Sequence, residues 1–343
     1  MRRHWRTLLA SVVGLAVAGA AVAHRHDLAA ALRRIGDLSA GWLLVLVVLT
    51  AATVISAGFA VAAVHPGLGV KRSITVHQAT VAATNSVVAS GPVSLALRIS
   101  MLRSWQQSDR AIAVSVVASN VLTSFRMWTV TLVVALIGIS GTATEILDRW
   151  VFVLVALVSA VVLVASGLWW WFVVRHPRLA AWFGRWAERL VTRLRRRWQR
   201  IPDIDVMGAI EAFRRDVTAL IRDRGRRIVS SSGFEMMLML VAPVMIARAF
   251  GITDATASTA EIVLAFGMVR LAAALSPLPG GIGVSEFGTT LLLSRFGVPE
   301  PAVLATVVTH RAITFFVPLL LGGVLLARWH RRSGRPSSVT AAA

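Results

Sequence analysis

Runs of apolar residues recur along almost the whole chain, and they constrain its fold more than any other feature. A helix needs about 20 apolar residues to cross the hydrocarbon of a bilayer. None of the runs alternates apolar and polar residues with the period of two that a membrane barrel requires. We therefore predict an all-α, polytopic transmembrane bundle of about eight spans. The apolar runs lie at 7–23, 42–63, 74–97, 111–138, 150–174, 228–250, 261–276, 277–297 and 301–327.

Composition agrees with a membrane protein and removes several kinds of chemistry. Hydrophobic residues make up 56% of the 343 residues and charged residues 15%, against about a quarter charged in soluble domains. The chain has no cysteine and no tyrosine, which excludes disulfides, thiolate metal sites and nucleophiles of either type. Its histidines and carboxylates do not follow a metal-binding spacing, so we expect neither a metal nor a cofactor.

The formal net charge of +20 comes almost entirely from arginines in the connections between apolar runs. Cytoplasmic loops collect basic residues, and anionic head groups attract them. We therefore expect no nucleic-acid partner and predict a multi-pass protein of the cell membrane with both termini cytoplasmic. The connections at 139–149 and 251–261 are acid-leaning and are expected on the outer side.

This orientation places a condition on the run at 74–97. If it crossed the membrane completely, the basic connection at 175–227 would lie outside, so we predict that 74–97 is re-entrant. The segment 7–23 resembles a signal peptide with a possible cleavage site at Ala21-Val22-Ala23, but we expect a retained span. The predicted parts are an N-terminal transmembrane half at 1–174, a basic linker at 175–227, a C-terminal transmembrane half at 228–330 and a disordered basic tail at 331–343.

The linker carries a pattern of its own at 178–198. Leucine, tryptophan and phenylalanine side chains there fall on one helical stripe, and most of the arginines lie off it. A basic amphipathic helix of this kind is typical of a membrane interface; the alternative is a solvated helix that packs on the protein's own loops. We expect a second polar helix at 205–227.

Ionisable side chains at membrane depth are costly and are candidates for function. Arginine stays charged and forms bidentate contacts with phosphate, so these residues suggest a cationic cavity for an anionic ligand. The alternative is internal pairing, with Glu286 bound to Arg311 or Arg270 and Glu235 as a second partner. The candidates are Arg98, Arg126, Arg270, Glu286 and Arg311.

The stretch Ser276–Gly288 contains the sequence SPLPGGIGVSEFG. Its prolines break a helix, and its glycines allow close approach of the backbone. We predict broken or re-entrant segments near 85–92 and 277–288, with a new helix beginning near Ile282. Its free N–H groups would favour an anion, unless Glu286 caps the helix instead. The glycines and prolines that we take as part of the site are Pro279, Gly280, Gly281 and Gly283.

PLPGGIGVSEFG resembles the signature of the lysylphosphatidylglycerol synthase transmembrane region family, the flippase-like membrane domain of bacterial aminoacyl-phospholipid proteins. Asn85, Pro92 and Arg98 are similar to an Asn…Pro…Gly-Glu…Arg element of that family, although Leu95-Ala96 replaces its Gly-Glu pair. The stretch that begins at His310-Arg311 and continues through Pro318 and Gly322 is similar to the family's closing helix.

The resemblance implies a membrane domain that handles lipids and, in some members, moves an aminoacyl phospholipid between leaflets. The family's aminoacyl-transferase domain follows the membrane region, and this chain ends at Ala343, so we do not expect lipid synthesis. We expect that 85–92 and 277–283 face each other and bind a phospholipid, either anionic or aminoacylated, or a polyprenyl phosphate.

Two other classes of function stay open. One is an accessory subunit of cell-envelope assembly, acting through a protein partner or as a homo-oligomer. The other is a membrane enzyme on a lipid phosphate, in which Glu286, His77 or His310 would act as the base.

Overall fold

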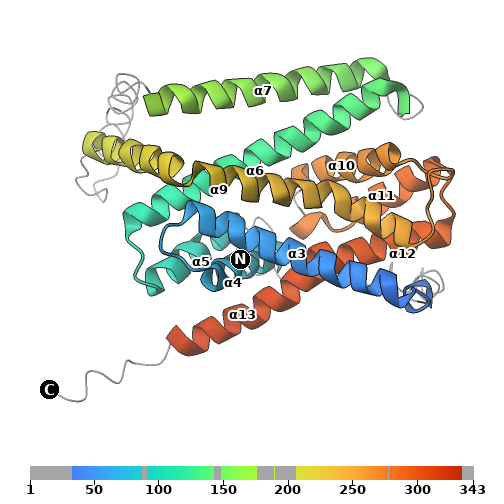
Figure 1. The fold of residues 1–343 in the computed structure, drawn as a ribbon, viewed down its shortest axis with the longest axis horizontal. Helices are drawn as coiled ribbons and strands as arrows, with labels where there is room; N and C mark the ends of the chain where they lie inside the picture. The colour runs from blue at the N-terminus through green and yellow to red at the C-terminus, as the bar shows by residue number, and fades with distance from the viewer. Residues whose placement is uncertain are drawn as a thin grey trace, which may run out of the picture.

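The computed structural model describes residues 33–86, 91–142, 148–175, 206–276 and 278–333, together with residue 189 alone. Over these residues the chain forms ten α-helices and three short π or 3₁₀ segments, and no strand. The predicted all-α membrane bundle is confirmed (Figure 1). The span predicted at 7–23 lies outside the described residues. Five stretches of helix are long and apolar enough to cross a membrane: Ala40–Val64, Asp109–Gly141, Arg149–Trp171, Met207–Ala249 and Glu300–Arg332.

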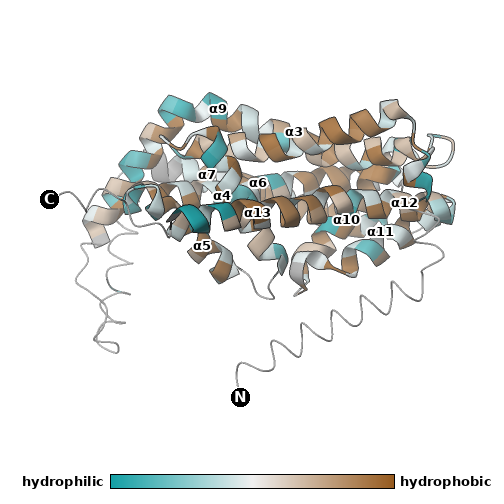
Figure 2. Ribbon diagram, turned by 90° about the horizontal axis from the view of Figure 1, so that it is seen from below, coloured by the Kyte–Doolittle hydropathy of each residue, from teal (hydrophilic) through white to brown (hydrophobic). Residues whose placement is uncertain are grey.

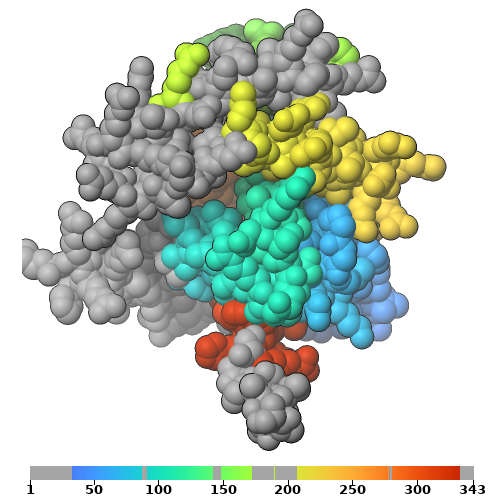
Figure 3. Space-filling model, turned by 90° about the vertical axis from the view of Figure 1, so that its left-hand side faces the viewer, coloured from blue at the N-terminus to red at the C-terminus, as the bar shows by residue number. Residues whose placement is uncertain are grey.

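Helices α3 (Ala40–Val64) and α9 (Val206–Ala249) run antiparallel and define two ends of the bundle. The first half of α3 packs on the end of α9, where Leu46 meets Ile246 in one buried cluster. The last turn of α3 packs on the first half of α9 through Val64 and Leu220. We call the end with Val64 the basic end, because the arginine-rich first half of α9 lies there; Figure 3 looks onto it. The other is the opposite end.

Helices α4 (Val70–Ser86) and α5 (Gly91–Ser104) form a hairpin whose outer ends both lie at the basic end. Leu102 of α5 packs with Val61 of α3 and Ile112 of α6 (Asp109–Ile137). The Nε1 of Trp329 donates to the Oγ of Ser104 at 2.9 Å. At about 1.5 Å per residue, α4 and α5 are roughly 26 and 21 Å long, which is less than the hydrocarbon thickness of about 30 Å.

Helices α10 (Thr259–Leu275) and α11 (Val284–Arg295) form a second hairpin that comes from the opposite end. Ile262 at the start of α10, Leu293 near the end of α11 and Ile252 after α9 share one buried cluster. With 12 residues, α11 is only about 18 Å long. The segments 261–276 and 277–297, which the sequence presents as two spans, therefore form a hairpin with its turn inside the bundle.

The inner ends of the two hairpins meet. A Cβ atom placed on Gly280, in the break of the second hairpin, would lie 3.2 Å from the Oδ1 of Asn85 at the end of α4. The residues between α4 and α5, 87–90, lie outside the described residues. Two broken segments that approach each other from opposite ends are an arrangement known from transporters, where the substrate site lies between them.

Glycines let the first hairpin pack tightly against its neighbours. A Cβ atom on Gly322 of α13 (Val317–Ser333) would overlap the backbone of Gln78 and lie 2.7 Å from the Cβ of Ala82. On the other side of α4, a Cβ on Gly58 of α3 would overlap Ile74. Because lipid gives helices no hydrophobic reason to associate, such close contact is a main source of their attraction.

Helix α9 continues through the boundary predicted at residue 228. Its 44 residues extend over about 66 Å, roughly twice the hydrocarbon thickness. Its first half is polar, with hydrophilic turns visible beside the α9 label in Figure 2, and its second half is apolar in sequence. The amphipathic segment 178–198 and the tail beyond Ser333 lie outside the described residues, apart from Arg189.

We expect Gly322→Ala to lower the free energy of unfolding by about 1–3 kcal/mol, because the added methyl group overfills the contact between α13 and α4. Gly323→Ala is the matched control, since nothing lies within 4 Å of its Cβ position. Thermal unfolding in detergent measures both variants. Equal unfolding temperatures for the two would contradict the close contact.

The absence of native cysteine allows a direct test of the hairpins. Single cysteines at Lys71 and Arg103, at the outer ends of the first hairpin, should react with a membrane-impermeant maleimide from one side of the membrane. Cysteines at Ala255 and Glu300, which flank the second hairpin, should react only from the other side. Labelling of Lys71→Cys and Arg103→Cys from different sides would mean that α4 and α5 together cross the membrane.

Candidate functional site

Two cavities lie where the hairpins meet the long helices. The first has a volume of about 190 Å³ and the second about 300 Å³. The first is lined by Asn85, Phe266, Val269, Arg270, Ala273, Gly280, Ser285, Thr289, Val307, His310, Arg311, Thr314 and Phe315. The second is lined by Ala57, Ala60, Val61, Val76, His77, Thr80, Val81, Thr84, Arg98, Ser119, Asn120, Leu122, Thr123, Arg126 and Glu235.

Arg311 fixes the break of the second hairpin to the closing helix. It is the last residue of α12 (Glu300–Arg311), and its side chain is only 12% exposed. Its Nε donates to Glu286 at 2.6 Å and its Nη1 donates to the carbonyl oxygen of Gly280 at 3.1 Å. The guanidinium also lies 5.1 Å from the ring centre of Phe315. A π-helical turn, η3 (Ala312–Phe316), follows directly, and such turns are frequent at functional sites.

Glu286 has both of the roles that the sequence suggested for it. It lies in the first turn of α11, where its Oε2 accepts the N–H of Gly283 at 2.7 Å. Its other oxygen binds Arg311, so the partner is Arg311 and not Arg270. Since the carboxylate takes up an N–H at the start of α11, that helix end is not free to bind an anion.

Arg270 differs from the other arginines of the site. It lies in the first cavity, and its side chain is exposed there. Among the described residues it has neither a hydrogen bond nor an ion pair. Arg126 is close enough for the two positive charges to repel each other. Arg270 is therefore an uncompensated positive charge at the inner part of α10.

The second cavity contains two further arginines. Arg126 forms an ion pair with Glu235 of α9, and both side chains are less than one-fifth exposed. The Nη2 of Arg98 donates to the Oγ of Ser119 at 2.8 Å. The Nε of Arg98 and the Nη2 of Arg311 are buried and have no partner within the part of the chain that the structure describes.

The charges of the two cavities do not cancel. The lining and its direct partners contain four arginines but only two glutamates, Glu235 and Glu286. Unused guanidinium donors in a region of low dielectric constant bind anions strongly, and they match phosphate oxygens in geometry. Within the described residues, no group of three or more histidine, aspartate or glutamate side chains could hold a metal ion.

The structure divides the predicted site residues into four groups. Asn85, Arg270, Gly280 and Arg311 line the first cavity, with Glu286 bound to Arg311, whereas Arg98 and Arg126 line the second. Pro92 lies exposed in the first turn of α5 and lines neither cavity. The backbone of Pro279, Gly281 and Gly283 forms the break itself, and both glycines have positive φ angles of 63° and 84°.

Sequence reasoning missed Ser119, Asn120 and Phe315. Ser119 and Asn120 are two adjacent polar residues inside the apolar run 111–138, and that pairing could have indicated a lining position. Phe315 carried no such signal, because it is one of many apolar residues in the run 301–327.

Comparison with known proteins agrees with a membrane fold. A curated protein of Pyrococcus horikoshii named as a UPF0104 membrane protein is 36% identical over 67 residues, which is 19% of this chain and 20% of that protein. The match thus spans about a fifth of that relative's length. Residues 7–322 match the family described as lysylphosphatidylglycerol synthase TM region. The matched residues include both hairpins and all the arginines of the two cavities. This chain therefore belongs to the lysylphosphatidylglycerol synthase TM region family.

Proposed function

We propose that this protein binds the phosphate group of a membrane lipid in the two arginine cavities and moves the lipid between the leaflets. The observation that carries the proposal is Arg270, whose guanidinium has no partner among the described residues and lies in a cavity between the two hairpins. A charged side chain inside a membrane is costly and is found mainly where it pairs or serves a ligand. A lipid phosphate supplies the missing negative charge.

The arrangement of donors supports a lipid phosphate as the ligand. Within the part of the chain that the structure describes, Arg98 and Arg311 each keep a buried nitrogen without a partner, and the guanidinium of Arg270 makes no hydrogen bond or ion pair. Arginine forms parallel, charge-assisted hydrogen bonds with phosphate. The phosphate of an anionic phospholipid, an aminoacylated phospholipid or a polyprenyl phosphate would fit these donors equally well, so the three classes are compared in one assay below.

The hairpins support movement between the leaflets. Each one comes from a different end of the bundle, and the two meet at Asn85 and Gly280. A head group bound there would have only short segments to pass on either side. The sequence contains no P-loop for ATP, so the lipid would move by passive exchange or be driven by a gradient. We place the basic end in the cytoplasm, on the arginine content of its connections.

Replacing Arg270 tests the proposal most sharply, because this side chain holds no other residue in place. In liposomes with fluorescent lipids, we expect Arg270→Ala to lose at least tenfold in lipid transfer, as one charge-assisted contact is removed. Unfolding temperature should stay unchanged. Arg295→Ala, at the exposed end of α11, is the control and should transfer lipid at the normal rate. Normal transfer by Arg270→Ala for all three lipid classes would refute the role of the cavity.

The Arg311–Glu286 pair should act on stability as well as on transfer. Arg311→Ala leaves a partly buried carboxylate without its partner and frees the Gly280 carbonyl, so we expect a loss of about 1–3 kcal/mol in unfolding free energy. Glu286→Gln should cost less, because glutamine can still accept from Gly283. The double variant should lose less than the sum of the two single losses. Additive losses would show that the two residues do not interact.

A further inference from the structure

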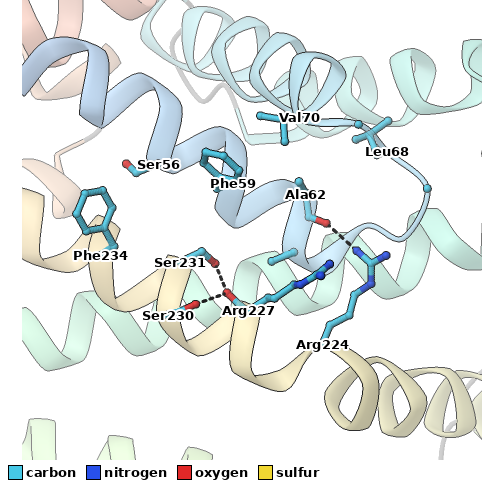
Figure 4. A pocket seen from close by; sticks show the side chains of 13 residues that line it. Ser56, Phe59, Ala62, Leu68, Val70, Arg224, Arg227, Ser230, Ser231 and Phe234 are labelled. Carbon is cyan, nitrogen blue, oxygen red and sulfur yellow. Dashed lines mark hydrogen bonds between the residues drawn. The ribbon is translucent and has the colours of Figure 1, made fainter. Parts of the chain in front are cut away.

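A larger cavity lies outside the arginine cavities, in a groove between α3 and α9 at the basic end. It has a volume of about 700 Å³. Figure 4 shows side chains from both helices and from the α3–α4 connection around it. The groove is lined by Ser56, Phe59, Ala62, Ala63, Gly67, Leu68, Gly69, Val70, Arg224, Arg227, Ser230, Ser231 and Phe234.

The groove lies where α9 changes character. Residues 222–227 read Arg-Asp-Arg-Gly-Arg-Arg, and the apolar half of the helix begins at Ile228. On α3, the lining residues belong to the last three turns before the helix ends at Val64. Both helices therefore place the groove at a membrane boundary, where head groups meet acyl chains.

Two arginines form the polar side of the groove. Arg224 donates from Nη1 to the carbonyl oxygen of Ala62 at 3.2 Å (Figure 4), and its other guanidinium nitrogens make no hydrogen bond or ion pair to a described residue. Arg227 is exposed and has no hydrogen bond or ion pair from its guanidinium among the described residues. The hydroxyls of Ser230 and Ser231 donate to the Arg227 carbonyl oxygen at 3.2 and 2.7 Å. The donors left for a ligand are thus the two guanidiniums.

Two phenylalanines form the apolar side. Phe59 of α3 and Phe234 of α9 are 50% and 51% exposed. In Figure 4 they lie on the side of the groove away from the arginine guanidiniums. Since the described residues of the lining include no acidic side chain, one end of the groove suits a negative charge and the other suits a hydrocarbon chain.

We propose that this groove binds one anionic phospholipid, with its phosphate on Arg224 and Arg227 and an acyl chain along Phe59 and Phe234. The site is separate from the arginine cavities, since Ala57, Ala60 and Val61 of α3 line one of those and other residues of α3 line the groove. Asp216 and Asp223 line an adjoining cavity that Arg224 and Arg227 also line, but they do not line the groove itself, and Asp216 is paired with Arg110.

Charge favours this lipid over the protein's own basic segments as the occupant of the groove. The stretch 178–198 is rich in arginine, so in the groove it would place positive charge against Arg224 and Arg227. A zwitterionic lipid would bring a cationic group to the groove, whose described lining residues include no carboxylate. A lipid with a net negative head group avoids both costs, and serine oxygens can accept from its hydroxyl groups.

The full chain, purified in detergent and titrated with phosphatidylglycerol or phosphatidylcholine, tests the proposal by native mass spectrometry. We expect one phosphatidylglycerol to bind at least tenfold more tightly than phosphatidylcholine, and Arg227→Gln to remove most of that preference. Arg226→Gln, the neighbouring exposed arginine that does not line the groove, is the matched control and should keep it. Arg270→Ala should also keep it, which separates this site from the lipid-transfer site.

Three results would overturn the proposal. One is equal binding of both lipids, and another is an equal loss in Arg226→Gln, which would indicate general surface charge. The third is a dimer that Arg227→Gln dissociates, which would mean that a second copy of the chain occupies the groove.

Phe234→Ala, compared with the lipid-exposed Met237→Ala, should weaken binding without altering the unfolding temperature, and no difference between these two would exclude acyl-chain contact.

Discussion

The ion pair between Arg311 and Glu286 is the interaction on which the inner part of the bundle depends. A helix that breaks inside a membrane leaves backbone groups that must be satisfied by protein. Here a single guanidinium binds the Gly280 carbonyl on one side of the break, and the carboxylate that it holds takes the Gly283 N–H on the other. The turn of the second hairpin can therefore lie beside Asn85, at the meeting point of the two hairpins, without exposing its backbone to lipid.

Pairing of this kind also separates structural arginines from available ones. Arg126 and Arg311 each have a carboxylate partner, Arg98 has only a hydroxyl, and Arg270 has no partner among the described residues. An ion pair that is buried needs good geometry to offset the loss of hydration; one pair here joins α6 to α9, and the other joins the successive helices α11 and α12. The remaining charge is concentrated between the hairpins, where the dielectric constant is low and an anion gains most from it.

Much of this could be predicted from the sequence, for identifiable reasons. Long apolar runs fix a helical membrane bundle, and the Pro-Gly stretch before Glu286 fixes a break. The pairing of Glu286 could be narrowed to Arg311 or Arg270 but not decided, because both lie in apolar segments at unknown depth and rotation. The distribution of Arg98, Arg126, Arg270 and Arg311 over two cavities depends on which helix faces which, and periodicity does not specify that. The sequence predicts the break near 277–288 but not the hairpin, since 261–276 and 277–297 are both apolar enough to count as spans and only their helical lengths show otherwise.

The hairpins have a consequence for the order in which the helices assemble in the membrane. Neither α4 nor α10 qualifies as a span by its own length and composition, and α10 carries Arg270, which adds about 2.5–3.5 kcal/mol to the insertion of an isolated helix. The long helices on either side of each hairpin are hydrophobic enough to enter the bilayer independently. The two hairpins thus depend on a bundle that already exists around them, so the hairpins that line the two arginine cavities are the last parts to be assembled, after the scaffold that shields them from lipid.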